Sequence, residues 1–241
     1  MDIQIKGKNR ISSFWTSRPA IAIQILIVLI PSIIFLKSGS LLLLGVFMGV
    51  CFSWIALRLQ KLKWTNVGFI QPTSFTRFII IVIVSTLLII ILSYFLRQLL
   101  TEIINEKPNL DAFNSVKGNP KVLLLGLLVV WIFGALGEEL LFRGFIINSL
   151  YNLLPDKYLN NAVKWTLALL FTSVFVGIGH AYQGKTGMIL TGFIGFFFGL
   201  VYLFSNRNLW ASIITHGLYD TVAFIMLYHG FNLDQIFGFL R

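Results

Sequence analysis

Long apolar runs separated by short polar segments dominate the chain. The runs that are long enough for helices have predicted bounds of 19–36, 41–57, 78–96, 121–154, 165–180, 187–204 and 209–228. A helix that crosses a bilayer needs about 20 mainly apolar residues, and most of these runs approach that length. The run at 121–154 exceeds it, so we expect one of its ends to protrude. The pattern predicts an all-α fold, a polytopic transmembrane helical bundle with about seven to eight spans.

The polar connections between these runs give the predicted organisation. The connection at 58–77 is basic, and its Trp64 suits the membrane–water interface. The longest polar connection, 97–120, is expected outside the cell, with a short interfacial helix at 98–106. The predicted parts are 1–120 with the first three spans, 121–229 with the helical core, and 230–241 as a short tail.

The composition excludes a soluble globular protein. Hydrophobic residues make up 57% of the 241 residues and charged residues only 12%, and the mean hydropathy is +0.85. A soluble domain carries about 25% charged residues, so the predicted surroundings of this chain are the lipid bilayer. The net charge of +10 then indicates loops that face anionic lipid, and we expect no nucleic-acid partner. The single Cys51 excludes an intramolecular disulfide.

Basic residues orient the predicted spans. Lys6, Lys8, Arg10 and Arg18 precede a first apolar run that is longer than the core of a signal peptide, so we expect a retained span and a cytoplasmic N-terminus. Seven spans then leave 12 Lys and Arg in cytoplasmic segments and 7 in external ones, in the direction of the positive-inside rule. The external residues are Lys37, Arg97, Lys107, Lys117, Lys121, Lys185 and Arg241. An eighth span or a re-entrant segment would invert the C-terminal half. The expected location is a cell membrane, with a compact length that suits a bacterial plasma membrane.

Ionisable residues inside the later apolar runs mark the candidate site. Charges at such depth are costly, and by default they indicate function. Glu139 and Arg143 are four residues apart and can pair on one helix face, as can His216 and Asp220. Glu138 is offset from Glu139 by about 100° on a helix of 3.6 residues per turn. One carboxylate is therefore expected to bind the arginine while Glu138 faces a cavity.

Two imidazoles are expected near Glu138. In an antiparallel hairpin of the fourth and fifth spans, Glu138 and His180 both lie about 25–29 Å from the turn. His216 fits less well, because it lies only about 12 Å from its own turn. A carboxylate with two imidazoles suits water activation by a general base, and the same set is also the ligand type of a hydrolytic zinc site. The candidate metal ligands are thus Glu138, His180 and His216, and the residues leave open whether the cofactor is Zn²⁺ or whether there is none.

Structural roles compete with these functional ones. An intramembrane histidine is often an interhelical hydrogen-bond donor, and the Glu139–Arg143 pair can be purely structural. The Phe-rich segment at 193–198 is expected to face lipid or to pack in the core. From the residues alone, an intramembrane hydrolase and a transporter are close to even.

Three motifs occur in order along the chain: Glu138-Glu139-Leu140-Leu141-Phe142-Arg143-Gly144, the segment 173–184 around His180, and His216-Gly217-Leu218-Tyr219-Asp220. Together they resemble the motifs of the CPBP intramembrane proteases, the CAAX prenyl protease and bacteriocin-processing proteins also called the Abi family. The resemblance covers roughly 121–224, and Val176 departs from it by standing where phenylalanine is usual.

The resemblance implies an α-helical intramembrane endopeptidase whose catalytic groups lie in a cavity open toward the cytoplasm. It implies Glu138 as the base and His180 as a residue that positions the water. His216 and Asp220 would assist the oxyanion, or His216 would bind a metal, while Glu139 and Arg143 form the supporting pair. An ionised Asp220 would oppose an oxyanion, so this side chain is expected to be protonated or to orient His216.

The leading hypothesis is an endopeptidase that hydrolyses a bond in a membrane-associated or prenylated peptide or protein, with water activated by Glu138. The alternative is a non-proteolytic membrane scaffold or immunity protein of the same fold. A transporter ranks third, because no paired broken spans or inverted repeat is visible. The sequence leaves the individual substrate and the oligomeric state open.

Overall fold

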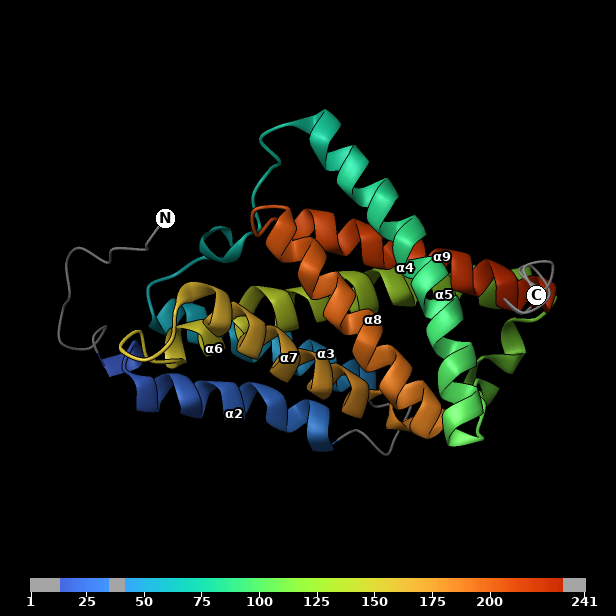
Figure 1. Ribbon diagram of the computed structural model, residues 1–241, viewed down its shortest axis with the longest axis horizontal. Coiled ribbons are helices and arrows are strands. Elements are labelled where there is room, and N and C mark those ends of the chain that lie inside the picture. Colours follow the sequence, from blue (N-terminus) through green and yellow to red (C-terminus); the bar gives the residue numbers. More distant parts are fainter. Residues whose placement is uncertain (1–13, 35–41, 232–241) are drawn as a thin grey trace.

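The computed structural model describes residues 14–34 and 42–231, which contain helices and connections and no β-strand. The predicted basic N-terminal segment before residue 14 and nearly all of the predicted tail lie outside the described residues. The elements drawn in Figure 1 are α2 (Arg18–Ile34), α3 (Leu42–Leu59), η1 (Trp64–Val67), α4 (Phe75–Ile104), η2 (Asp111–Val116), α5 (Pro120–Val129), η3 (Val130–Ile146), α6 (Ile147–Leu153), α7 (Asn161–Gly179), η4 (Ala181–Gln183), α8 (Gly184–Phe204) and α9 (Leu209–His229).

Short polar side chains set where several of these helices begin. The side-chain oxygens of Asn119, Asn160 and Asn208 accept backbone N–H groups in the first turns of α5, α7 and α9. Such caps satisfy donors that the helix itself leaves unpaired. At the other end, Asn105 and Gly230 adopt positive φ values of 55° and 69° and stop α4 and α9.

The helices confirm the predicted helical membrane bundle. Five helical segments of the described chain are long and apolar enough to cross a membrane: Phe75–Ile104, Pro120–Leu153, Asn161–Gly179, Ala181–Phe204 and Leu209–His229. The first two predicted spans correspond to the shorter apolar helices α2 and α3. Much of the outer surface is apolar, as on α4, where Ile80, Val84 and Leu87 are each more than half exposed. Such a surface is stable against lipid tails rather than water.

The predicted interfacial helix at 98–106 is wrong. Residues 98–104 are instead the last turns of α4, which is 30 residues long and ends only at Asn105. The sequence between Phe78 and Ile104 contains no Gly or Pro, so nothing breaks the helix where the continuous apolar run ends.

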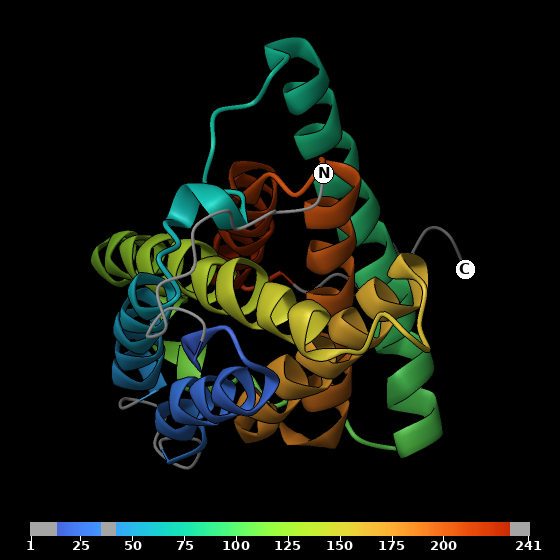
Figure 2. The ribbon, with the colours of Figure 1, turned by 90° about the vertical axis from the view of Figure 1, so that its left-hand side faces the viewer.

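The helix that carries the glutamate pair runs through the middle of the bundle. Segments α5, η3 and α6 form one continuous helical rod, with α3 packed against η3 on one side and α9 on the other. Figure 2 shows this rod crossing the molecule between the blue α2 and α3 and the red α9. The central position surrounds the pair with protein instead of lipid, which lowers the cost of its charges.

The connections gather at two opposite ends of the bundle. We call the first the Gly68 end. There the N–H of Leu209 donates to the carbonyl of Gly68 (2.9 Å), and the hydroxyl of Tyr202 donates to the carbonyl of Val67 (2.9 Å). We call the second the Asn109 end. There the N–H of Asn109 donates to the carbonyl of Gln183 (2.8 Å). The Gly68 end holds the connections 60–74, 154–160 and 205–208, and the Asn109 end holds 105–119 and 180–183.

Candidate active site

The glutamates lie on a helical segment with wider turns than an α-helix. Over Val130–Ile146 the backbone is π-helical, and the N–H of Ile147 still donates to the carbonyl five residues earlier. Such turns are rare and often occur at functional sites. The 3.6-residue geometry assumed from the sequence does not apply here, yet the two carboxylates are separated as expected. Glu139 is fully buried, whereas Glu138 is half-buried on the wall of a cavity.

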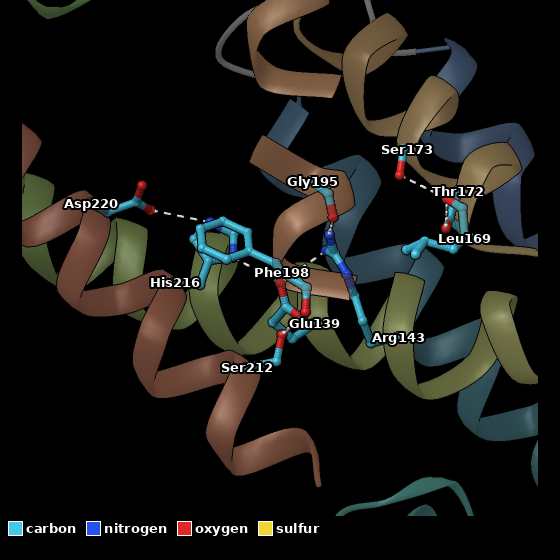
Figure 3. Close-up of polar contacts among 10 residues, drawn as sticks. All are labelled: Glu139, Arg143, Leu169, Thr172, Ser173, Gly195, Phe198, Ser212, His216 and Asp220. Atoms are coloured by element: carbon cyan, nitrogen blue, oxygen red, sulfur yellow. Dashed lines mark hydrogen bonds and ion pairs between the residues drawn. The ribbon is translucent and has the colours of Figure 1, made fainter. Parts of the chain in front are cut away.

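Glu139 is the centre of a buried polar network (Figure 3). Its Oε1 atom accepts from Arg143 Nη1 (2.9 Å) and lies 3.0 Å from His216 Nδ1, while its Oε2 accepts from the hydroxyl of Ser212 (2.5 Å). A buried carboxylate is tolerable only when a cation and further donors compensate it. The predicted Glu139–Arg143 pair is present. The spacing of the residues did not predict that the same oxygen also contacts His216.

A close approach of α8 completes the surroundings of Arg143. The second guanidinium nitrogen donates to the backbone carbonyl of Gly195, as Figure 3 shows. A Cβ atom at Gly195 would lie only 3.0 Å from Val176 and 3.5 Å from Arg143 Nη2. The absence of a side chain at this position therefore lets the two helices approach closely enough for the guanidinium to be satisfied.

His216 is held on three sides. The ring of Phe198 stacks on its imidazole with a centroid distance of 4.3 Å and an interplanar angle of 21°. Its Nδ1 faces Glu139, and its Nε2 lies 3.4 Å from Asp220 Oδ2. Asp220 thus contacts the His216 ring, and its orienting role stays a prediction. The geometry also gives Phe198, expected only to face lipid or fill the core, a direct contact with the site.

A cavity of about 390 Å³ brings the predicted site residues together. Its wall includes Glu138 from η3, His180 from the turn after α7, and His216 and Asp220 from α9. Most of the remaining wall is apolar and comes from α3, η3, α8, α9 and the 105–119 connection, whereas α4 contributes the polar Ser93 and Arg97. Four polar groups from three separate parts of the chain thus converge on one largely apolar chamber, as small-molecule and peptide sites commonly do.

His180 lines the cavity and has one ring nitrogen, Nε2, without a hydrogen bond to a described residue. Its Nδ1 is 2.9 Å from the carbonyl oxygen of Val176, which can only accept a hydrogen bond, so Nδ1 carries the proton. In the neutral ring Nε2 is then an acceptor. Tyr182 lines the same cavity, with its ring centroid 5.8 Å from that of His180. Its hydroxyl oxygen accepts from Gln183 Nε2 (3.1 Å), which leaves the hydroxyl proton available to another acceptor.

The candidate metal ligands do not fit a three-ligand metal site. Within the described parts of the chain, no group of three His, Cys, Asp or Glu side chains is arranged to hold a metal ion. Of Glu138, His180 and His216, the last has both ring nitrogens directed at carboxylates. A hydrolytic zinc ion needs three protein ligands with free donor atoms. The water activation proposed for this site therefore uses side chains alone.

The sequence is similar to a known protease family over the part that contains this site. Residues 120–222 match the family model of the Rce1-like proteins, described as type II CAAX prenyl endopeptidase Rce1-like. Over this segment the chain is similar to an Rce1-like domain. The matched segment runs from α5 into α9 and includes Glu138, His180, His216 and Asp220. It is consistent with the resemblance to the CPBP proteases. Searches of curated proteins and of solved structures found no match.

The family match and the fold together support a coarse class. Rce1-like proteins are proteases, and the long apolar helices identify a multi-pass membrane protein. Both observations support a membrane-embedded peptidase that acts on a membrane-associated substrate.

Proposed function

We propose that the protein is an intramembrane endopeptidase in which Glu138 activates the hydrolytic water. The observation that carries the proposal is the convergence of Glu138, His180, His216 and Asp220 on one cavity inside an Rce1-like domain. The different surroundings of the two glutamates support this proposal. Glu139 contacts Arg143, Ser212 and His216, whereas Glu138 has no hydrogen bond or ion pair to another described residue and lines the cavity.

The first chemical step is attack by water. Glu138 accepts one proton of the water, and the neutral His180 ring accepts a hydrogen bond from the other through Nε2. The water oxygen forms a bond to the scissile carbonyl carbon, and the carbonyl oxygen becomes an oxyanion. Donors aimed at that oxygen stabilise it, and the hydroxyl of Tyr182, which lines the cavity, is such a donor. His216 supports the same wall through its contacts with Glu139 and Asp220.

Collapse of the tetrahedral intermediate completes the reaction. The carbon–nitrogen bond breaks, and the proton held by Glu138 moves to the leaving amine nitrogen. The products are a new carboxyl group and a free amine, and Glu138 is again a carboxylate. One water is consumed, and no redox partner is required.

The substrate class proposed is a peptide segment of a membrane-associated protein, including prenylated C-terminal segments of the CAAX type. Two features support this class: the family match and the mainly apolar wall of the cavity. An apolar wall favours apolar peptide side chains or a lipid group through burial of their surface.

Replacing Glu138 by Gln tests the proposal. The protein is reconstituted in vesicles, supplied with a farnesylated CAAX-type peptide and a library of apolar peptides, and the products are identified by mass spectrometry. We expect Glu138→Gln to lower kcat by about 10²- to 10⁴-fold while the melting temperature stays unchanged, because general-base catalysis is lost. Glu102→Gln, an exposed carboxylate near the end of α4, is the matched control. Full activity in Glu138→Gln would instead favour a non-proteolytic membrane scaffold.

A further inference from the structure

The cavity extends toward one end of the bundle only. From the network around Arg143 it reaches the Asn109 end, where Pro108, Leu110 and Phe113 of the 105–119 connection form part of its wall. No residue of the connections at the Gly68 end lines it. Material can therefore reach Glu138 from the Asn109 end, while packed helices separate the site from the Gly68 end.

The 105–119 connection is fixed in place beside the site. The side-chain oxygen Oε1 of Glu106 accepts the backbone N–H of Lys185 (2.7 Å), and its backbone carbonyl accepts the hydroxyl of Thr186 (2.7 Å). The N–H of Asn109 donates to the carbonyl of Gln183, three residues after His180. These bonds join the connection to the start of α8, so the border of the cavity at this end is a built part of the fold.

Basic residues are unequally shared between the two ends. Lys and Arg concentrate on the cytoplasmic side of membrane proteins, a rule that counts basic residues near span ends. The eight of the described chain at the Gly68 end are Arg18, Arg58, Lys61, Lys63, Arg77, Lys157, Lys164 and Arg207. The five at the Asn109 end are Arg97, Lys107, Lys117, Lys121 and Lys185. This excess of Lys and Arg residues assigns the Gly68 end to the cytoplasm.

We infer that the cavity opens to the non-cytoplasmic side of the membrane, so that its substrate is a peptide segment presented on that side. That the cavity binds a substrate rests on the proposed function, but the orientation of the cavity does not. The sequence-based expectation of an external 97–120 connection agrees with this orientation. The cytoplasmic opening implied by the family resemblance does not, because the structure joins the cavity to that same connection.

The orientation narrows the substrate class. A protein prenylated at a cytoplasmic C-terminus cannot reach Glu138 without crossing the bilayer. An apolar segment of an exported or membrane-anchored protein, exposed at the outer surface, meets the apolar rim of Leu110 and Phe113 directly. Burial of apolar side chains against that rim would draw such a segment out of the interface and into the cavity.

Cysteine labelling tests the orientation independently of activity. In a Cys51→Ser background, Ser115→Cys marks the Asn109 end and Thr73→Cys marks the Gly68 end; both native residues are exposed. Intact bacterial cells that express each variant are treated with a membrane-impermeant maleimide. We expect labelling of Ser115→Cys in intact cells and of Thr73→Cys only after permeabilisation. The opposite result, or labelling of both in intact cells, overturns the inference.

Two reporters then separate the orientation from the proposed function. Each is a single-span protein with the same apolar test segment, placed on the outer side in one and on the cytoplasmic side in the other. We expect cleavage of the outer reporter alone, and none with Glu138→Gln. Cleavage of the cytoplasmic reporter alone overturns the inference. Cleavage of neither, with maleimide labelling as expected, contradicts the proposed peptidase activity and leaves the orientation established.

Discussion

Nδ1 of His216 lies 3.0 Å from Oε1 of Glu139, the same oxygen that accepts the guanidinium of Arg143. One buried carboxylate thus fixes an arginine on its own helix and a histidine 77 residues later. The position of the His216 ring in the cavity therefore depends on a pair that is itself hidden from the substrate. Substitutions in this pair are expected to change both stability and the geometry of the site.

Replacing Glu139 by Gln leaves the Arg143 charge buried without its counter-charge. Breaking a buried pair in this way costs about 3–5 kcal/mol. We expect a clear loss of thermal stability in detergent, together with lower activity, because the Gln amide can no longer hold Arg143 and His216 as the carboxylate does.

The matched comparison is the double variant Glu139→Gln with Arg143→Met. Because the unpaired charge is then absent, the double variant should lose less stability than the sum of its two single variants. Strict additivity in a double-mutant cycle would contradict the coupling of the two side chains that the geometry indicates.

Ser212 tests the remaining oxygen of the carboxylate. Its hydroxyl is 2.5 Å from Glu139 Oε2 and 3.0 Å from the carbonyl of Phe198. Replacement by Ala removes a donor to a buried charge, so we expect a cost of about 1–3 kcal/mol in the free energy of unfolding. Thr215→Val is the control on the same helix, because its buried hydroxyl has no hydrogen-bond partner among the described residues. Equal effects of the two substitutions in thermal unfolding would argue against a specific role for Ser212.

Part of this site follows from the sequence because it depends on spacing within one helix. The pairs Glu139–Arg143 and His216–Asp220 are each four residues apart, and both meet in the structure. Ser212 stands four residues before His216 and could have been identified by the same spacing. It was missed because a single serine in an apolar run carries no distinct signal.

Other features depend on contacts that no local pattern encodes. The bond between Glu139 and His216 joins segments far apart in the chain, so it follows only from the packing of α9 against η3. The π-helical turns at Val130–Ile146 change the backbone register without any marker in the composition. Most helix bounds were predicted to within about three residues, but α7 begins at Asn161 and not at the predicted residue 165, because Asn160 caps it earlier in the chain. They failed at the end of α4, where the helix continues past its apolar part to Asn105.

Gly195 is expected to tolerate no side chain. A Cβ there would lie 3.0 Å from the side chain of Val176, which is closer than ordinary contact, so Gly195→Ala should destabilise the fold by about 1–3 kcal/mol through overpacking. Gly179→Ala is the control, since a Cβ at Gly179 meets nothing within 4 Å. The control should be neutral or raise stability by about 0.5–1 kcal/mol, because alanine is the better helix former. Thermal unfolding of both variants in one detergent decides between these outcomes.

Tyr182 is expected to contribute to turnover rather than to folding. Its hydroxyl accepts from Gln183 and keeps its own proton for an acceptor in the cavity, where the oxyanion would form. Removal of one oxyanion donor lowers kcat by about 10²–10³-fold in enzymes that depend on it strongly. Tyr182→Phe should therefore lower kcat substantially, with KM and melting temperature nearly unchanged. Tyr158→Phe, an exposed tyrosine at the Gly68 end, should leave all three quantities unchanged. A rise in KM at constant kcat would show instead that the Tyr182 hydroxyl binds the substrate in its ground state.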